Sequence, residues 1–326
     1  MSQDSTGNTP KAIAVLSQKG GQGKSAVAVN VAHELSCRGY KVAVADFDPN
    51  GHLTSDLEYR EHANNTDQHF ASYTSDSTVA TELSDFVIST EFGWDFIPNI
   101  PKENYTEWET HLIDNTPSSV PCIKPLFDDL KQHYHFIVID TGPTKTRLID
   151  ATLETIKYCM IPIRVGDGEE VLISTIHDLV YVTRSGTSGP IPRLKVLAIF
   201  PTFVQQPVNR MTRERLLIEK LCQSESTGQA VPNFAYISSD QFEKLDAGNY
   251  DELPRPGLRK ARALDDAEPL REVNSSHEQL PCFEELASIA ERGYVDRSAH
   301  PHIDTNSSAD NQTGDNTPTR RSDSQL

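Results

Sequence analysis

The sequence predicts an α/β fold, in which a single doubly wound, mostly parallel sheet carries helices on both faces. Two observations lead to this prediction. Short apolar runs alternate with helical patterns from Lys11 onward, which is typical of repeated βαβ units. In addition, a glycine-rich turn joins the first apolar run to the first helical pattern, an arrangement that gathers backbone N–H groups at a helix N-terminus.

The individual elements follow from apolar runs and helical periodicity. Strands are predicted at residues 12–16, 41–45, 94–98, 135–140, 158–164 and 194–200. Helices are predicted at residues 26–35 (ending near Gly39), 123–133, 169–183 and 209–222. The polar residues 55–77 predict a long surface loop.

The chain of 326 residues is long enough to bury one large core. We expect a flexible arm at residues 1–10, one domain at 11–295 and a tail at 296–326 that is too polar to fold. Since no stretch of eighteen apolar residues and no signal peptide is evident, we expect a cytoplasmic protein that does not enter the membrane. Five scattered cysteines without a C-x-x-C pair indicate reduced thiols.

The net charge of -17, from 47 acidic and 30 basic side chains, excludes a generic polyanion-binding protein. Any contact with nucleic acid must therefore come from local basic clusters. The excess of acids suggests adaptation to a salty cytosol, and simple solubility is the alternative.

The glycine-rich turn is a candidate phosphate-binding loop. Its backbone N–H groups and the helix dipole favour an anion, Lys24 can reach the β- and γ-phosphates, and the Ser25 hydroxyl can hold Mg²⁺. An ordinary glycine-rich loop is the alternative. The candidate nucleotide-binding residues here are Lys19, Gly20, Gly21, Gln22, Gly23, Lys24, Ser25 and Ala26.

Three carboxylates stand where strands are predicted to end. Asp140 ends the most apolar strand, where an acid can orient Mg²⁺ through water, or else simply cap a turn. Asp46 and Asp48 follow the second strand and should lie at the carboxyl edge of the sheet, beside a nucleotide. Asp48 could also serve only as a turn former before Pro49.

The loop departs from the common pattern G-x-x-x-x-G-K-[ST], because Gln18 stands where the first glycine is expected and Lys19 follows it. The resulting form, K-G-G-x-G-K-[ST], resembles the deviant phosphate loop of the ParA/MinD family of ATPases. This resemblance extends over roughly residues 11–270 and implies the P-loop NTPase fold, with ATP and Mg²⁺ as cofactors.

Two further segments carry the resemblance. Residues 46–51, D-F-D-P-N-G, are similar to the family's D-x-D-P-Q-G switch, with Asn50 in place of glutamine. Residues 140–143, D-T-G-P, resemble its D-x-P-P second switch, with Gly142 in place of the first proline, which would loosen that turn.

The resemblance also assigns roles. Lys19 would reach across a nucleotide-sandwich dimer to the partner's phosphates, and Lys24 would neutralise charge within its own subunit. Asp48 would position or polarise the attacking water. The metal site would comprise Ser25, Asp46 and Asp140, and the strand end with Pro201 and Thr202 would lie near the purine.

Within the family, the ParA branch fits best. The tail at residues 305–326 lacks the basic amphipathic helix of MinD-like proteins, and no cysteines are spaced for a metal cluster. Dethiobiotin synthetase shares the fold but lacks a lysine like Lys19. ParA membership implies an ATP-dependent homodimer, nonspecific DNA binding, a nucleoid location and a ParB-like adaptor, with a plasmid, chromosome or other cargo. The alternative is a metabolic or assembly ATPase of the same fold that does not bind DNA.

Two basic groups are candidates for the DNA surface, although they could equally be solvated arginines paired with nearby acids. They comprise Arg210, Arg213 and Arg215, and then Arg255, Arg259, Lys260 and Arg262.

Overall fold

The computed structural model of the chain describes most of the predicted domain. The described residues are 11–17, 19–65, 69–73, 82–100, 105, 110, 120–143, 146–156, 158–164, 195–202, 268–276 and 280–292. The predicted helices at 169–183 and 209–222, the arm, the tail and all seven candidate DNA-binding residues lie outside them.

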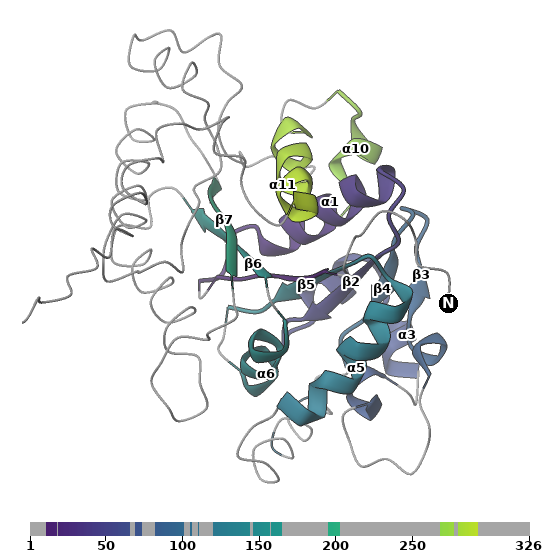
Figure 1. Cartoon of the computed structure of the whole chain (residues 1–326). Coiled ribbons are helices and arrows are strands. Elements are labelled where there is room, and N and C mark those ends of the chain that lie inside the picture. Colours follow the sequence, from purple (N-terminus) through teal and green to yellow (C-terminus); the bar gives the residue numbers. More distant parts are fainter. Residues whose placement is uncertain are drawn as a thin grey trace, which may run out of the picture.

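A seven-stranded sheet forms the centre of this part of the chain, in the order β3-β4-β2-β5-β1-β6-β7 (Figure 1). Every neighbouring pair is parallel except β3 with β4, which confirms the predicted mostly parallel sheet. The strands are β1 (Lys11–Val15), β2 (Val42–Phe47), β3 (Ile88–Ser89), β4 (Asp95–Ile97), β5 (Phe136–Thr141), β6 (Tyr158–Arg164) and β7 (Lys195–Thr202).

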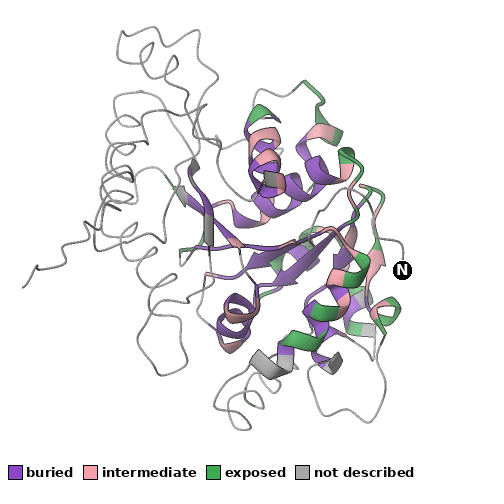
Figure 2. Cartoon of the chain, viewed as in Figure 1, coloured by how far each residue is buried: buried purple, intermediate pink, exposed green. Residues whose placement is uncertain are grey.

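Helices cover both faces of the sheet, as predicted (Figures 1 and 2). One face packs against α1 (Lys24–Cys37), α10 (Leu270–Val273) and α11 (Leu280–Arg292), and the other against α5 (Val120–His133) and α6 (Arg147–Thr155). Two separate hydrophobic clusters result, because alternate residues of β1 point to opposite faces: Ile13 joins the first and Ala14 the second. The sheet is therefore buried on both sides, as its apolar strands require.

The first helix shows why this packing follows from the sequence. Val27, Val31 and Leu35 of α1 are completely buried in the cluster that also contains Phe283 of α11. Helices α10 and α11 were not predicted, although α11 covers much of α1. Lys11 ties the two ends of the domain together, since its Nζ donates to the Ala290 carbonyl oxygen at 3.1 Å.

The prediction of a loop over residues 55–77 was wrong for the part that the structure describes. This segment contains the end of α2 (His52–Asp56), all of α3 (Arg60–Asn65) and the short 3₁₀ helix η1 (Phe70–Tyr73). Phe70 is fully buried, and its ring centroid lies 4.8 Å from that of Phe47. Tyr59 packs similarly against Phe96, with ring centroids 5.6 Å apart, so aromatic residues anchor a stretch whose average composition is polar.

The other predicted elements that fall on described residues are confirmed, most of them with shifted ends. Strand β2 continues two residues beyond Ala45, so Asp46 lies within the strand and pairs in register with Asp140 of β5. Strand β5 likewise extends by one residue, to Thr141. A further 3₁₀ helix, η2 (Leu83–Asp85), precedes β3. In the described part of the chain, no helix combines the length and apolar character needed to cross a membrane.

Candidate nucleotide-binding site

The glycine-rich loop turns the chain from the end of β1 into the N-terminus of α1. Gly21 and Gly23 have φ angles of 70° and 80°, a left-handed conformation that glycine adopts without strain. Helix α1 begins directly after Gly23, its N-cap residue, which as a glycine has no side chain to cap the N-terminus. Its first N–H groups therefore keep the capacity to bind an anion.

Lys24 is buried at the start of α1, with 7% of its surface exposed. Burial lowers the pKa of its ammonium group, while the charges of Asp140 and Asp48 act in the opposite direction. Both carboxylates are thus close enough to influence Lys24. The structure brings together three residues that the sequence placed in one site.

Asp140 is the buried acid of this site whose hydrogen-bonding capacity is least satisfied. Among the described residues, none makes a hydrogen bond of normal geometry to either of its carboxylate oxygens, although the Ser25 hydroxyl lies near enough to affect the pKa of the acid. Burial and the charge of Asp46 raise the pKa of Asp140, whereas the Ser25 hydroxyl and the Lys24 ammonium lower it. Buried polar groups without partners are rare and often mark a place for an ion. Carboxylate and hydroxyl oxygens suit Mg²⁺, so Asp140 and Ser25 fit the predicted metal.

Asp46 is fully buried but already satisfied within the chain. Its Oδ2 accepts hydrogen bonds from the Thr54 N–H at 2.8 Å and the Thr54 hydroxyl at 2.7 Å, and its Oδ1 accepts one from the Asp48 N–H at 3.0 Å. Burial raises its pKa, and these hydrogen bonds lower it. Asp46 therefore fixes the switch segment to α2, and its role at the metal remains a prediction.

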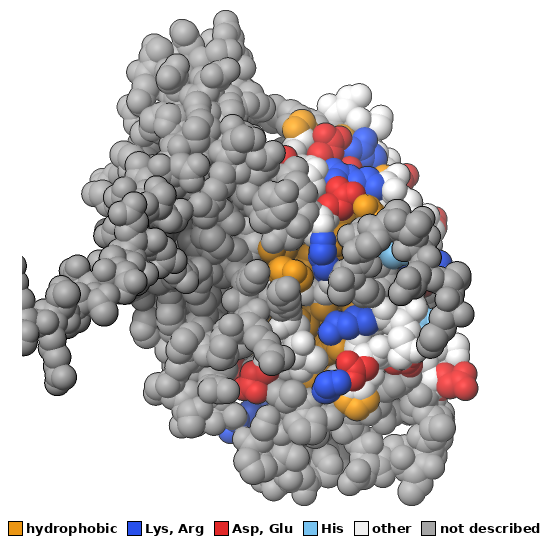
Figure 3. Space-filling view, viewed as in Figure 1, with side chains coloured by type: hydrophobic (Ala, Val, Ile, Leu, Met, Phe, Trp, Pro, Cys, Tyr) orange, Lys and Arg blue, Asp and Glu red, His pale blue; other side chains and the backbone are white. Residues whose placement is uncertain are grey.

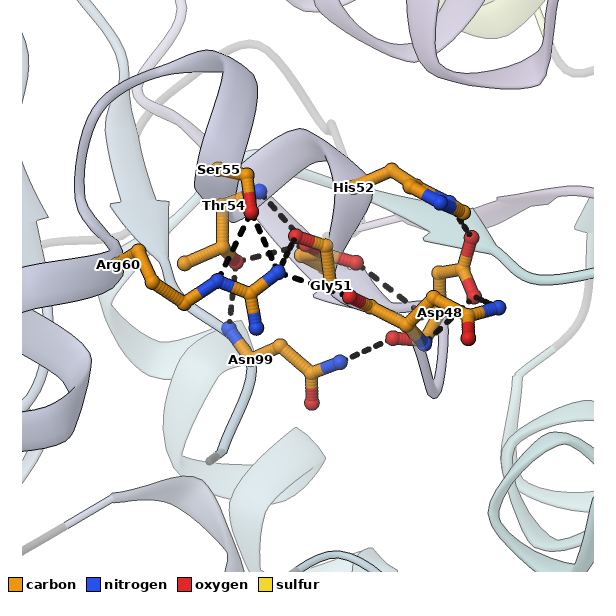
Figure 4. Close-up of polar contacts among 9 residues, drawn as sticks. Asp48, Gly51, His52, Thr54, Ser55, Arg60 and Asn99 are labelled. Atoms are coloured by element: carbon orange, nitrogen blue, oxygen red, sulfur yellow. Dashed lines mark hydrogen bonds and ion pairs between the residues drawn. The ribbon is translucent and has the colours of Figure 1, made fainter. Parts of the chain in front are cut away.

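Asp48 opens a tight turn that ends at Gly51 (Figure 4). The Gly51 N–H donates to the Asp48 carbonyl oxygen at 2.7 Å, and the Asn50 N–H donates to Asp48 Oδ1 at 2.9 Å. Asp at the first position, Pro at the second and Gly at the fourth are favoured in such turns. Asp48 thus does form the predicted turn, and its carboxylate also influences Lys24.

Two residues that the sequence analysis missed, Arg60 and Asn99, hold this turn in place (Figure 4). The Arg60 guanidinium donates to the carbonyl oxygens of Asn50 at 2.8 Å and Gly51 at 2.7 Å. The Asn99 side chain donates to the Asp48 carbonyl oxygen, and its N–H donates to the Thr54 hydroxyl at 2.9 Å. Only Asn99 had a signal in the sequence, because it follows a predicted strand at the same edge of the sheet.

The other predicted nucleotide-binding residues occupy different environments. Lys19 and Gly20 are exposed, and Ala26 lies in the first turn of α1. Gln22 is buried, and its Oε1 accepts a hydrogen bond from the Arg164 N–H of β6 at 2.5 Å. Pro201 and Thr202 end β7. The Thr202 hydroxyl is buried without a hydrogen-bond partner in the described part of the chain.

Comparison with known proteins identifies a family. A family model described as an AAA domain, AAA_31, matches residues 10–184. An uncharacterised protein of Methanocaldococcus jannaschii is 24% identical over 231 residues, which cover 69% of this chain and 82% of that protein. The chromosome-partitioning ATPase Soj of Thermus thermophilus is 25% identical over 195 residues, which cover 58% of this chain and 68% of Soj.

Solved structures with the same fold include a ParA protein and a biosynthetic enzyme. The structure of pNOB8 ParA bound to nonspecific DNA matches with a TM-score of 0.58 and 20% identity, over 87% of this chain and 98% of that one. Cobyrinic acid a,c-diamide synthase of Mycobacterium smegmatis, with a bound ATP analogue and magnesium, matches with a TM-score of 0.57 and 18% identity, over 86% and 93%. At these identities the likeness concerns the fold.

Proposed function

The chain belongs to the AAA domain family as a P-loop ATPase of the ParA/MinD type, and on that premise we propose that it is a ParA-like positioning ATPase. It dimerises on ATP, binds DNA without sequence preference, and hydrolyses ATP to segregate or position a plasmid, a chromosome or another cargo. The observation that carries the proposal is the convergence of Lys24, Asp48 and Asp140 at the N-terminus of α1, where the N-cap residue is Gly23.

The proposed site binds the triphosphate through the loop and Lys24. Backbone N–H groups of residues 20–25 surround the phosphates, and the buried ammonium group of Lys24 neutralises their charge. Ser25 and Asp140 would hold Mg²⁺, which neutralises phosphate charge when bound. Pro201 and Thr202 at the end of β7 would lie beside the base, where the buried Thr202 hydroxyl supplies a polar contact.

Hydrolysis is an in-line attack of water on the γ-phosphate. The Asp48 carboxylate accepts a hydrogen bond from that water and orients it. Lys19 is exposed at the entrance to the loop, which is the position from which a lysine can reach the phosphates of a second subunit. A cation supplied in trans stabilises the transition state only in the dimer, so hydrolysis is coupled to assembly.

The DNA-binding step rests on the ParA relatives and on the two arginine-rich groups. Because the chain has a net charge of -17, contact with DNA must be local and must increase when two subunits join. A ParB-like adaptor would then stimulate hydrolysis and release the dimer. The location in the cell would accordingly be the nucleoid.

The test combines ATP hydrolysis with a salt titration of DNA affinity. Fluorescence anisotropy of a random duplex should rise with ATP and not with ADP, and log K should fall with log salt at a slope of about -0.9 for each phosphate contacted. Reversing Arg259 and Lys260 to glutamate should flatten the slope and leave ATP hydrolysis intact. Reversing Lys124 and Lys131 of α5 is the matched control and should change neither.

Each result has a definite meaning. An unchanged slope for the first double variant removes that group from the interface. ATP hydrolysis without ATP-dependent DNA binding at any salt concentration would favour an ATPase of metabolism or complex assembly. The absence of ATP hydrolysis by the wild-type chain, alone and with DNA, would contradict the proposed function itself.

A further inference from the structure

Two residues to which the proposed function assigns no role adjoin the Asp48 carboxylate: His52 contacts it, and Gly142 leaves the room that it occupies. We propose that both are positioning residues, which fix Asp48 where it can orient the attacking water. This inference rests on the proposed function, because it takes Asp48 as the residue that orients water. It goes further by naming the residues that hold the Asp48 carboxylate in the orientation needed to position the attacking water.

Gly142 leaves the space that Asp48 occupies. A Cβ atom at position 142 would lie 2.8 Å from Asp48 Oδ1 and 2.8 Å from Pro49 Cδ, distances that real Cβ contacts essentially never show. The φ angle of Gly142 is outside the left-handed region, so alanine could adopt this backbone conformation. Glycine is therefore needed here for room and not for conformation.

The sequence suggested that Gly142, in place of the first proline of the D-x-P-P pattern, loosens the turn. The structure instead indicates that glycine makes room for the Asp48 carboxylate. A proline at position 142 would also carry a Cβ atom, and that atom would meet the Asp48 carboxylate. The glycine in the second switch is thus complementary to the first switch. The two segments are 94 residues apart in the sequence (142 less 48) and fit together at this point.

His52 holds the other oxygen of the same carboxylate (Figure 4). Its Nδ1 lies 3.0 Å from Asp48 Oδ2, while Oδ1 accepts hydrogen bonds from the N–H and side-chain amide of Asn50 at 2.9 and 3.2 Å. With the proton on Nδ1, the imidazole donates to Oδ2. Because each oxygen has its own donor, the carboxylate cannot rotate freely.

The exposure of the two partners separates this contact from an ordinary surface pair. The His52 side chain is 66% exposed and the Asp48 side chain only 7%, so an outer residue reaches an inner carboxylate. Oδ1 already accepts two hydrogen bonds from Asn50, whereas the single contact with His52 leaves the second lone pair of Oδ2 for a water molecule. Loss of the donor would leave Asp48 in place but allow its carboxylate to turn.

The experiment measures kcat and KM for ATP with the full chain. His52→Leu should lower kcat about three- to tenfold, as expected for the loss of one orienting hydrogen bond. His52→Asn keeps an N–H near the Nδ1 position and should recover most of that loss. The matched control is His133→Leu, since His133 is also exposed and pairs with an aspartate four residues earlier, at 3.4 Å on α5. It should leave kcat unchanged.

Gly142→Ala should lower kcat about 10- to 100-fold, because small displacements of a catalytic group are costly. Affinity for a fluorescent ATP analogue should stay within about twofold of wild type in the His52 variants, since their effect is on orientation and not on phosphate binding. Thermal melting checks that each variant folds. Should Gly142→Ala fail to fold, the three histidine variants still decide the matter.

The outcomes separate this inference from the proposed function. If the wild-type chain hydrolyses ATP and Asp48→Ala slows it, the proposed role of Asp48 stands. An unchanged or increased kcat in His52→Leu, or an equal loss in His52→Leu and His52→Asn, would then overturn the positioning role. If Asp48→Ala hydrolyses ATP at the wild-type rate, the role of Asp48 fails, and the inference fails with it.

Discussion

The two ends of helix α1 differ in whether the buried charged side chains there have hydrogen-bond partners. Near its C-terminal end, Glu34 is bound by Arg271 of α10 through two contacts of 2.8 Å, and Arg271 also reaches Glu284 of α11 at 2.6 Å. At its N-terminal end, Lys24 and Asp140 are buried, and the Asp140 oxygens lack partners among the described residues. Charge is satisfied at one end and left open at the other.

This contrast separates scaffold from site. Arg38 adds to the satisfied end, since it donates to Glu291 at 2.6 Å and to the Ser288 hydroxyl at 3.0 Å. Figure 3 shows basic and acidic side chains intermixed on the face that it displays, as such pairing requires. A hollow of about 560 Å³ beside Glu34 and Arg271 is lined by paired charges. Unpaired buried charge is the more informative mark of a ligand site.

The sharpest test of this comparison measures ATP affinity after one substitution at each end of α1. Lys24→Ala should lower ATP affinity at least about 100-fold, because a buried cation facing the phosphates is lost. Arg271→Met, at the satisfied end, should leave ATP affinity within about twofold. Calorimetric titration with ATP measures both, and equal losses in the two variants would contradict the division.

The second prediction concerns stability at the satisfied end. Arg271→Met should lower the free energy of unfolding by about 1.5–3 kcal/mol, since Glu34 loses charge-assisted hydrogen bonds while remaining buried. The control is Lys124→Met, which removes the exposed partner of Asp128 and should cost less than about 1 kcal/mol. Urea unfolding distinguishes them. Similar costs would show that the Glu34 contacts behave as an ordinary surface pair.

The smallest effect is expected for a substitution near the N-terminal end of α1, measured on the nucleotide-free chain. At a pH above the raised pKa of Asp140, Asp140→Asn should raise the melting temperature of the nucleotide-free chain by about 2–4 °C, because a buried carboxylate charge without a hydrogen-bond partner among the described residues is removed. It should also abolish the additional stabilisation that Mg²⁺ gives together with ATP. A lower melting temperature for Asp140→Asn would mean that the carboxylate is satisfied in solution.

The pH dependence follows from the same residue. Burial raises the pKa of Asp140, so the folded chain holds a proton that the unfolded chain releases. Its contribution to stability is complete below the ordinary carboxyl pKa and is lost as the pH rises through the raised value. The slope of stability against pH should therefore be shallower in Asp140→Asn than in wild type.

The sequence was sufficient for the sheet and for the residues with strong local signals. Apolar runs predicted six of the seven strands, and the glycine-lysine pattern located Lys24 and Ser25 at the start of a helix. Strand β3 is only two residues long and carries too little pattern to be found. Phe70 was missed for a related reason, because isolated aromatic residues within a polar stretch give no periodic signal.

The contacts around Asp48 could not be predicted, because they depend on geometry between distant segments. Arg60 binds carbonyl oxygens nine and ten residues earlier only because α3 folds back toward the turn. Gly142 meets Asp48 only because β2 and β5 are neighbours in the sheet. The pairing of Glu34 with Arg271 spans 237 residues and has no local signature. Spacing reveals chemistry within a motif, and the fold determines which motifs meet.

The most direct test of the account compares ATP-dependent assembly in the wild type with Asp48→Ala and Lys19→Ala. Light scattering with Mg²⁺ and ATP, read together with phosphate release, should show a transient dimer for the wild type and a persistent dimer with little release for Asp48→Ala. Lys19→Ala should bind ATP and remain a monomer. An unchanged ATP-dependent dimer in Lys19→Ala, together with wild-type hydrolysis in Asp48→Ala, would contradict the account.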